Sequence, residues 1–473
     1  MEKILSNRKT VDISKEEIQE QKEYIDNIKE LIKGRSLKYH IITYGCQMNI
    51  HDSEKLAGML NSMGYTETSD QAEADLILFN TCCVRENAEH RVYGNVGALY
   101  LNKQQNPNLI IGICGCMMQQ RDVSDYITKK FPFVDLIFGT HNLHRFPKLL
   151  LEAMDSRQTV VEVLDEEGRI VENVPIKRNL GVTAWTTIMY GCDNFCSYCI
   201  VPYVRGRERS RQPSDILDEI NQLAEEGYKE VTLLGQNVNS YGKDFNEPYY
   251  FSNLLRYIDR VDGIERIRFM TSHPKDLSKD LILAMAESEK VCEHLHLPIQ
   301  SGSNRILKQM NRGYSRENYL ELVNEIRHQI PNIAITTDII VGFPGETEED
   351  FADTLDMVEK VRYDSAFTFI YSQRTGTPAA KMSKQIDENI KKERLQKLMD
   401  VQGKISKEIN DKAHDTIVDV LVEGLSKKRD DMYTGRTPQN KLVNFAADHN
   451  TIGNIVKVKI TQPKTWTLEG IMI

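Results

Sequence analysis

No stretch of the 473-residue sequence is apolar for long enough to cross a bilayer, and the opening MEKILSNRKTVDISKEEIQEQ is too polar for a signal peptide. We therefore expect a cytoplasmic protein that has no membrane partner. The sequence also lacks an excess of positive charge, because its formal net charge is −9. This argues against wholesale binding of nucleic acid by bulk charge and leaves room for a local basic patch.

The nine cysteines are the informative part of the composition. In a reducing compartment, clustered thiols are more often metal ligands or catalysts than disulfides. Residues 190–211, YGCDNFCSYCIVPYVRGRERSR, contain three cysteines and four arginines. We call Cys192, Cys196 and Cys199 the radical-loop cysteines. They lack a fourth cysteine or histidine ligand at regular spacing nearby.

Hydrophobic patterns divide the chain into five segments. Residues 1–36 are polar and helix-prone, which predicts a solvated extension. Residues 37–154 alternate the β-rich runs KYHIITYG, ADLILFNT and LIIGICG with helical segments, which predicts a parallel-sheet α/β domain. The charged residues 155–180 predict a connector. Residues 181–410 form a second α/β unit, and 411–473 show the alternating pattern of a small β-barrel or sandwich.

The central segment contains six candidate βα units, with the strands TTIMYG, EVTLLGQ, RIRFMTS, HLHLPIQ, ITTDIIVG and AFTFIY. Such a series predicts a complete or partial (β/α) barrel. In these barrels the site is built from the loops at the carboxyl ends of the strands. The radical-loop cysteines follow the first strand, so we expect them at the mouth of the barrel.

Three thiolates can ligate three irons of a [4Fe–4S] cluster and leave the fourth iron open to a small molecule. The alternatives are a structural zinc site, or a redox dithiol made by the C-x-x-C of Cys196 and Cys199. Another trio ends strands of the N-terminal sheet, where open α/β sheets place their sites, and soft thiolates suit iron–sulfur clusters. We call this trio the sheet-edge cysteines: Cys46, Cys82 and Cys116.

Several motifs, in order, resemble a known family: YGCQMN, NTCCVRENAE, GICGCMMQ, CDNFCSYC, TLLGQNVNSYG, HLPIQSGS, TDIIVGFPGETEEDF and YTGRTPQNKLVNF. They resemble the radical S-adenosylmethionine (SAM) superfamily and, within it, the MiaB-type methylthiotransferases that make 2-methylthio-N6-isopentenyladenosine in tRNA. The likeness runs from about residue 38 to the end, and its last part is similar to the TRAM RNA-binding domain. It implies an α/β fold with a radical SAM partial (β/α)6 barrel and a TRAM-like C-terminal barrel.

The resemblance implies two [4Fe–4S] clusters and SAM as cofactors. The radical-loop cysteines would hold the cluster that splits SAM to a radical, and the sheet-edge cysteines a second cluster that carries sulfur. By analogy, the strand-end residues Gln236, Gln300 and Asp338 would bind the amino acid or ribose of SAM. The other three cysteines, Cys83, Cys114 and Cys292, are expected to pack in the core. Spacing alone leaves open that Cys83 or Cys114 is a ligand in place of its neighbour. The family pattern selects Cys82 and Cys116.

The implied substrate is C2 of N6-isopentenyladenosine at position 37, in the anticodon loop of tRNA. A low-potential electron donor such as flavodoxin or ferredoxin is also implied. Sibling enzymes modify a ribosomal-protein aspartate or a threonylcarbamoyl-adenosine, and NTCCVRENAE and LVNF favour the isopentenyladenosine enzyme. A different class would be a zinc-bound RNA-binding protein without catalysis.

Two basic segments are candidates for contact with RNA phosphates. The arginines of the first either contact RNA or support the site, and the C-terminal segment also offers Tyr433 and Phe445 for stacking on bases. Both rings are alternatively core residues, and this is favoured for Phe445. The candidate RNA-binding residues are Arg205, Arg207, Arg209, Arg211, Lys428 and Arg436.

Overall fold

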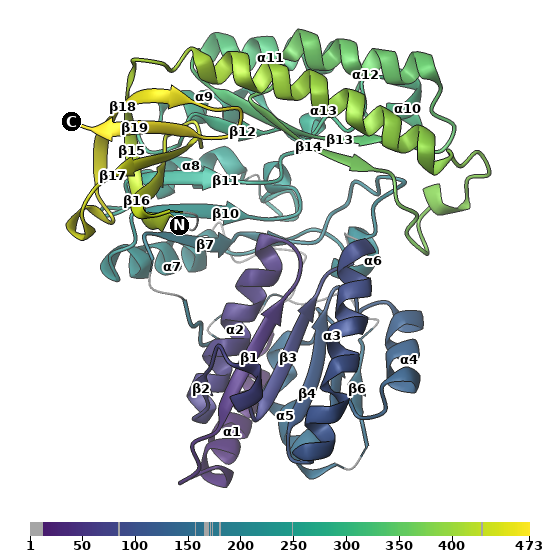
Figure 1. The fold of residues 1–473 in the computed structure, drawn as a ribbon. Helices are drawn as coiled ribbons and strands as arrows, with labels where there is room; N and C mark the ends of the chain where they lie inside the picture. Colours follow the sequence, from purple (N-terminus) through teal and green to yellow (C-terminus); the bar gives the residue numbers. More distant parts are fainter. Residues whose placement is uncertain are drawn as a thin grey trace.

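The computed structural model describes residues 13–83, 86–156, 158–164, 170, 172, 174–178, 181–247, 249–426 and 429–473. Three units follow one another along the chain: a sheet domain, a central open barrel and a small closed barrel (Figure 1). Within these described ranges, no helix is both long and apolar enough to span a membrane.

The first unit is a six-stranded sheet in which all neighbouring strands are parallel, in the order β2-β1-β3-β4-β5-β6. Its strands are β1 (Lys38–Thr43), β2 (Thr66–Glu67), β3 (Leu76–Thr81), β4 (Ile110–Gly115), β5 (Leu136–Phe138) and β6 (Val160–Glu162). Strand β3, LILFNT, is buried along its whole length because helices cover both faces of the sheet. Leu76 and Leu78 pack with one set of helices, and Ile77 and Phe79 with the other.

The helices form two layers, one on each face of the sheet. The first contains α1 (Lys15–Leu31), α2 (Gln47–Met63) and α5 (Phe146–Asp155), and the second contains α3 (Glu86–Gln105) and α4 (Arg121–Lys130). The expected solvated extension is wrong for α1, because Ile25, Ile28 and Ile32 are buried in the core of the sheet domain. The expected connector is also shortened, because residues 160–162 form the sixth strand.

The central unit confirms the expected α/β partial barrel. Two three-stranded parallel sheets, β7-β10-β11 and β12-β13-β14, are joined by a parallel bridge between Ile267 and Val291, so the strands lie side by side in chain order. The strands are β7 (Thr183–Thr187), β10 (Glu230–Leu234), β11 (Arg266–Phe269), β12 (His294–His296), β13 (Ala334–Val341) and β14 (Ser365–Ile370). Its helices are α7 (Pro213–Glu225), α8 (Phe251–Ile258), α9 (Lys279–Glu287), α10 (Asn304–Gln309), α11 (Arg316–Gln329), α12 (Glu348–Val361) and α13 (Glu388–Asp411).

One strand departs from expectation. The predicted run TTIMYG breaks after Thr187, and β8 (Met189–Tyr190) pairs antiparallel with β9 (Arg209–Ser210). This short hairpin encloses the radical-loop cysteines and the one-turn helix α6 (Val201–Arg205).

The C-terminal unit is a closed barrel in the order β15-β16-β17-β19-β18, which leaves no free sheet edge. Its strands are β15 (Ile417–Ser426), β16 (Arg429–Arg436), β17 (Leu442–Ala446), β18 (Ile455–Pro463) and β19 (Leu468–Met472). Tyr433 and Phe445 are 9% and 0% exposed and belong to its core. Neither ring is therefore available for stacking on bases.

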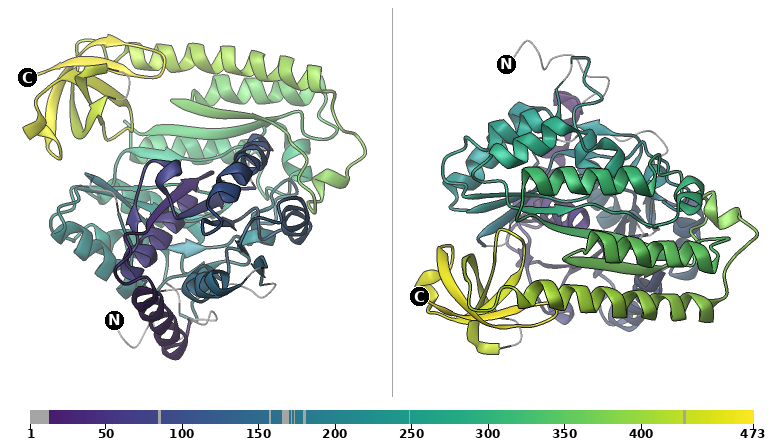
Figure 2. Two further views of the ribbon diagram at one scale, coloured as in Figure 1. Left: turned by 60° about the horizontal axis from the view of Figure 1, so that its bottom comes forward. Right: turned by 90° about the horizontal axis from the view of Figure 1, so that it is seen from above.

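The closed barrel docks against the amino ends of the central strands (Figure 2). Arg268 of β11 donates to the carbonyl oxygens of Thr437 at 2.8 Å and Pro438 at 2.9 Å. Lys441 pairs with Asp364, just before β14, at 2.7 Å. The barrel therefore lies at the end of the central strands opposite to the radical-loop cysteines.

Candidate active site

The radical-loop cysteines lie between β8 and α6, where a strained loop begins. Gly191 has φ +75°, and a Cβ at this position would lie 2.0 Å from the carbonyl oxygen of Arg207, so only glycine fits. Burial raises the pKa of Cys192 to about 11 and that of Cys199 to about 12. The free thiols of Cys192 and Cys199 therefore stay protonated at neutral pH, and bound iron is what would convert them to thiolates.

Two side chains donate to the sulfurs of this loop. Arg312, which is buried, lies with one guanidinium nitrogen 3.2 Å from Cys196 Sγ, and Asn194 Nδ2 lies 3.5 Å from Cys192 Sγ. Donors and positive charge beside the sulfurs stabilise an anionic cluster. The donor set therefore fits a [4Fe–4S] cluster.

Buried polar atoms without a partner lie just past β10 and β11. They are Asn237 Oδ1, Asn239 Oδ1, Ser272 Oγ and His273 Nε2, each unpaired among the described residues. His273 Nδ1 accepts from the backbone N–H of Lys275 at 3.2 Å, so its Nε2 carries the proton and is a donor. Buried polar groups normally have partners, and this gathering of acceptors and donors beside the radical loop therefore fits a polar ligand.

These unpaired residues were not among the predicted SAM contacts. Their signal in the sequence is their position directly after EVTLLGQ and RIRFM. Of the predicted residues, Gln236 accepts from the Gly191 N–H and contacts the Met48 sulfur, so its amide already supports the radical loop.

The other two predicted SAM contacts lie on the neighbouring strands. Gln300 has φ +70° and forms a main-chain bridge to Ile339 of β13. Asp338 Oδ1 lies 3.5 Å from His296 Nε2. The structure brings Asp338 and His296 together on adjacent strands, and the assignments to SAM stay predictions.

The sheet-edge cysteines follow β1, β3 and β4, which are neighbours in the sheet, so their loops meet at one edge (Figure 1). Gly45 has φ +125°, and a Cβ there would lie 2.5 Å from Cys82 Cβ, which makes glycine necessary for the close approach of the first two loops. Asn49 Oδ1 lies 3.7 Å from both Cys46 Sγ and Cys116 Sγ. Asn49 therefore marks the centre of this site, and sequence reasoning did not single it out.

The other cysteines differ in their surroundings. Cys114 lies in the apolar core of the sheet domain and Cys292 is buried in the central unit. Cys83 instead forms a hydrogen bond with Cys116. This hydrogen bond, with the charge of Arg205, lowers the pKa of Cys116 to about 6. The position of Cys83 beside the sheet-edge site keeps it an alternative ligand to Cys82.

Within the part of the chain that the structure describes, no three Cys, His, Asp or Glu side chains group closely enough for a single metal ion. Each thiolate of a [4Fe–4S] cluster binds a different iron. Its ligands therefore need not converge on one point, and the donor set of each trio still fits a cluster.

Most of the predicted RNA contacts of the arginine run are wrong. Arg205, Arg209 and Arg211 are only 5%, 6% and 4% exposed, so they cannot lie against phosphates. Arg209 donates to the carbonyl oxygens of Arg205 and Arg207, at 3.0 and 2.9 Å. Arg207 alone among the four keeps an exposed side chain, over the Phe195 ring and 3.4 Å from Asp193.

The C-terminal candidates are less constrained. Arg436 is half-buried and pairs with Glu423 at 3.2 Å. Lys428 lies outside the described residues. Arg207 and Arg436 therefore remain candidates for contact with RNA, and Lys428 stays a prediction.

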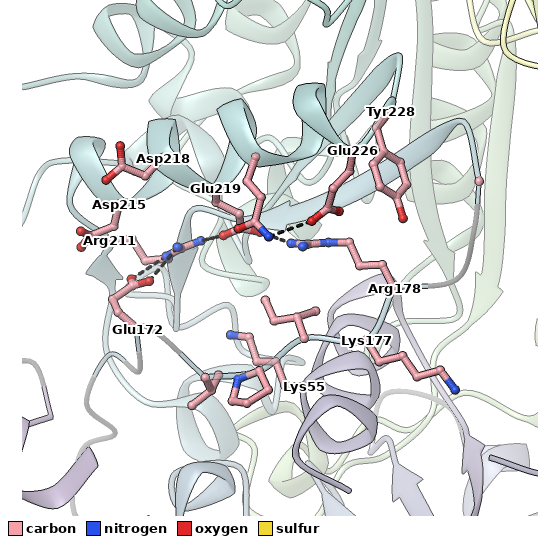
Figure 3. Close-up of a pocket in the computed structure, with 15 residues that line it drawn as sticks. Lys55, Glu172, Lys177, Arg178, Arg211, Asp215, Asp218, Glu219, Glu226 and Tyr228 are labelled. Carbon is pink, nitrogen blue, oxygen red and sulfur yellow. Dashed lines mark hydrogen bonds and ion pairs between the residues drawn. The ribbon is translucent and has the colours of Figure 1, made fainter. Parts of the chain in front are cut away.

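A cavity of about 840 Å³ lies between α2, the connector and α7 (Figure 3). Its two arginines are paired within it: Arg211 pairs with Glu172 at 2.6 Å and with Glu219 at 2.7 Å, and Arg178 also pairs with Glu219. None of the sheet-edge or radical-loop cysteines is among the described residues that line it. These pairs join the connector to the central unit and neutralise both arginines.

Three family models match the chain: the Radical SAM superfamily over residues 186–358, the Uncharacterized protein family UPF0004 over 38–139, and the TRAM domain over 413–473. The chain is 60% identical to the tRNA-2-methylthio-N(6)-dimethylallyladenosine synthase of Acetivibrio thermocellus over 100% of both chains. It is 58% identical to the synthase of the same name from Alkaliphilus oremlandii, over 99% of this chain and 100% of that one.

Among solved structures, the chain is similar to the radical S-adenosylmethionine methyltransferase TsrM from Kitasatospora setae, whose structure contains cobalamin and a [4Fe–4S] cluster. The TM-score is 0.53 at 15% identity, over 73% of this chain and 74% of that one. At this identity the likeness shows the fold alone.

Proposed function

The chain belongs to the tRNA-2-methylthio-N(6)-dimethylallyladenosine synthase family of radical SAM enzymes, and on that premise we propose a specific reaction for it. It transfers a methylthio group to C2 of N6-isopentenyladenosine at position 37 of tRNA, with two [4Fe–4S] clusters and two molecules of SAM. The observation that carries the proposal is the placement of two cysteine trios at strand ends of adjoining domains, with Arg205 of one domain touching Cys116 of the other.

The chemistry explains why two sites are needed. When bound, the radical-loop cluster supplies the electron that splits SAM, and the sheet-edge cluster holds the sulfur. The C2–H bond of adenine is neither acidic nor electrophilic, so an acid or a base in the site would not activate it. The protein's part is therefore to bind, orient and exclude water.

The residues around the radical loop suit the amino-acid part of SAM. The acceptors Asn237 Oδ1 and Asn239 Oδ1 suit its ammonium group, and the His273 Nε2–H suits its carboxylate. Burial, with the charges of Arg312 and Lys275, lowers the pKa of His273 to about 2. His273 therefore stays a neutral donor throughout the working pH range.

The predicted SAM contacts Gln236, Gln300 and Asp338 remain part of the proposal, each holding the amino acid or the ribose of SAM. Arg207, Arg436 and the predicted Lys428 are the candidates for contact with phosphates of tRNA. A low-potential donor such as flavodoxin or ferredoxin would supply the electrons.

Anaerobic purification and iron analysis test the two-cluster proposal. We expect a brown protein with about eight irons per chain. Replacing Cys196 by Ala should abolish SAM cleavage, whereas replacing Cys82 should spare cleavage and stop sulfur insertion. A colourless protein that contains zinc, or equal loss of cleavage in both variants, would contradict the proposal.

Mass spectrometry of tRNA nucleosides from a deletion strain tests the substrate. We expect loss of the methylthio group with retention of the isopentenyl group. Unchanged tRNA nucleosides together with an unmodified ribosomal protein would assign the chain to a sibling activity instead.

A further inference from the structure

Arg205 belongs to the central domain but its guanidinium lies in the sheet domain's site. It is the last residue of α6, six positions after Cys199, and is almost fully buried. Its Nε lies 3.2 Å from Cys116 Sγ, and a terminal nitrogen lies 2.8 Å from Asp52 Oδ2. One short segment therefore carries the radical-loop cysteines and also touches a sheet-edge cysteine.

The guanidinium also fixes the amide at the centre of the sheet-edge site. It donates to Asn49 Oδ1 at 2.9 Å, and that oxygen lies 3.7 Å from the sulfurs of Cys46 and Cys116. Asn49 Nδ2 in turn donates to the carbonyl oxygens of Tyr44 and Thr81, each at 3.0 Å. The loops after β1 and β3 are thus tied to Arg205 through one amide.

A buried guanidinium needs compensating negative charge. Asp52 is the carboxylate hydrogen-bonded to Arg205, and another of the guanidinium's donors is directed at a sulfur. A thiolate, the form in which cysteine ligates iron, is anionic and a strong acceptor. The contact with Arg205 therefore suits a Cys116 that ligates iron.

Resting on the proposed function, we propose that Arg205 is a positioning residue that locks the sheet-edge cluster against the radical-loop segment and raises the reduction potential of that cluster. A positive charge and an N–H donor at a ligand sulfur stabilise the more negative, reduced state. The fixed geometry keeps the sulfur donor and the radical source at one separation, so that radical formation leads to product.

Arg312 provides the matched comparison within the chain. It is also buried, and it donates to the Cys196 sulfur at 3.2 Å and to the Pro298 carbonyl oxygen at 3.1 Å, both within the central domain. Each trio therefore has its own arginine at one sulfur, but only that of the sheet-edge trio crosses the domain boundary.

The test uses the full-length, anaerobically loaded enzyme and its Arg205→Gln and Arg205→Lys variants. EPR-monitored redox titrations give the potential of each cluster, and added SAM identifies the radical-loop signal. We expect Arg205→Gln to lower the potential of the sheet-edge cluster only and to raise 5′-deoxyadenosine formed per methylthio product severalfold. Arg205→Lys should recover part of both effects, because it restores the charge.

Two controls separate this role from general loosening. Arg312→Gln should shift the reduction potential of the radical-loop cluster and leave that of the sheet-edge cluster unchanged. Arg207→Gln, in the same arginine run but exposed, should shift neither potential. If Arg205→Gln binds only about four irons but still cleaves SAM, selective loss of the sheet-edge cluster supports the inference.

Three outcomes would overturn it: an unchanged sheet-edge potential in fully loaded Arg205→Gln, an equal shift of both clusters, or loss of both clusters together. The wild-type protein distinguishes this failure from failure of the proposed function. A wild-type chain with about four irons would contradict both the two-cluster reaction and the inference. About eight irons in the wild type, with no change of the sheet-edge potential in Arg205→Gln, would contradict the inference alone.

Discussion

Replacing Arg211 by Gln tests whether the arginine run is structural. Its guanidinium contacts both carboxylate oxygens of Glu172, at 2.6 and 2.7 Å, and Glu219 Oε2 at 2.7 Å. The side chains of Arg211, Glu172 and Glu219 are 5%, 15% and 11% exposed, so the substitution removes a charged partner from two buried carboxylates. Breaking a buried pair in this way costs about 3–5 kcal/mol. Because Arg178 still pairs with Glu219, we expect the lower end of this range.

The pH dependence of the loss has a defined sign. Burial would raise the pKa of Glu219, but the charges of Arg211 and then Arg178 outweigh it and the pKa is lowered. A carboxylate whose pKa is depressed by folding stabilises the protein above its unfolded pKa, and that stability is lost as the pH falls through the folded value. The difference between wild type and Arg211→Gln should therefore be complete at pH 7 and shrink below about pH 4.5.

Thermal melting of the cluster-free protein gives the readout, with Arg207→Gln as the matched control on the same run. The melting temperature should fall by about 6 °C for Arg211→Gln and stay almost unchanged for Arg207→Gln. Affinity for tRNA as a function of salt provides the converse test. The slope of the logarithm of affinity against the logarithm of salt concentration should decrease in magnitude by about 1 for Arg207→Gln and stay the same for Arg211→Gln. An unchanged melting temperature with a reduced salt slope for Arg211→Gln would refute the reasoning.

Three further predictions concern other parts of the chain. Cys82→Ser should lose about four irons while Cys83→Ser keeps about eight, and the reverse result by iron analysis would assign the ligand to Cys83. Arg268→Ala removes two of the docking bonds to the C-terminal barrel and leaves buried Glu230 without its ion-pair partner, so limited proteolysis should cut between the units faster than in wild type; equal rates would contradict this. Burial raises the pKa of Glu54 to about 7, so the stability of the protein falls as the pH rises from about 4.5 to 7 and stays lower above that. Glu54→Gln should therefore melt at a higher temperature than wild type at pH 8 and at nearly the same temperature at pH 5.

The architecture could be predicted from the sequence because its determinants are local. Runs such as ADLILFNT identify buried strands, and parallel order fixes which loops share an edge. This is why the sheet-edge cysteines and the radical-loop cysteines lie at strand ends as expected. The burial of helix α1 was missed because few apolar residues, Ile25, Ile28 and the following Ile32, face the core in an otherwise polar segment.

The direction of the arginine side chains could not be predicted because it depends on distant partners. Asp52 lies 153 residues before Arg205, and Glu172 lies 39 residues before Arg211. A run of alternating arginines is the same in sequence whether it faces solvent or a set of buried carboxylates. The two readings differ in partners that only the folded chain brings together.

The same geometry constrains how RNA can lie on the protein. The C-terminal barrel is bonded to the amino ends of the central strands through Arg268, whereas the radical-loop cysteines follow the first of these strands at its carboxyl end. Strand β7, the first of these strands, has 5 residues and spans about 17 Å from one end to the other. An RNA that contacts Arg436 while its reacting base lies near the cysteines must therefore extend over at least this length. Under the proposed function, the base that reacts and the RNA segment that the barrel would hold lie apart in space, so binding by the barrel would add affinity without occupying the site of the chemistry.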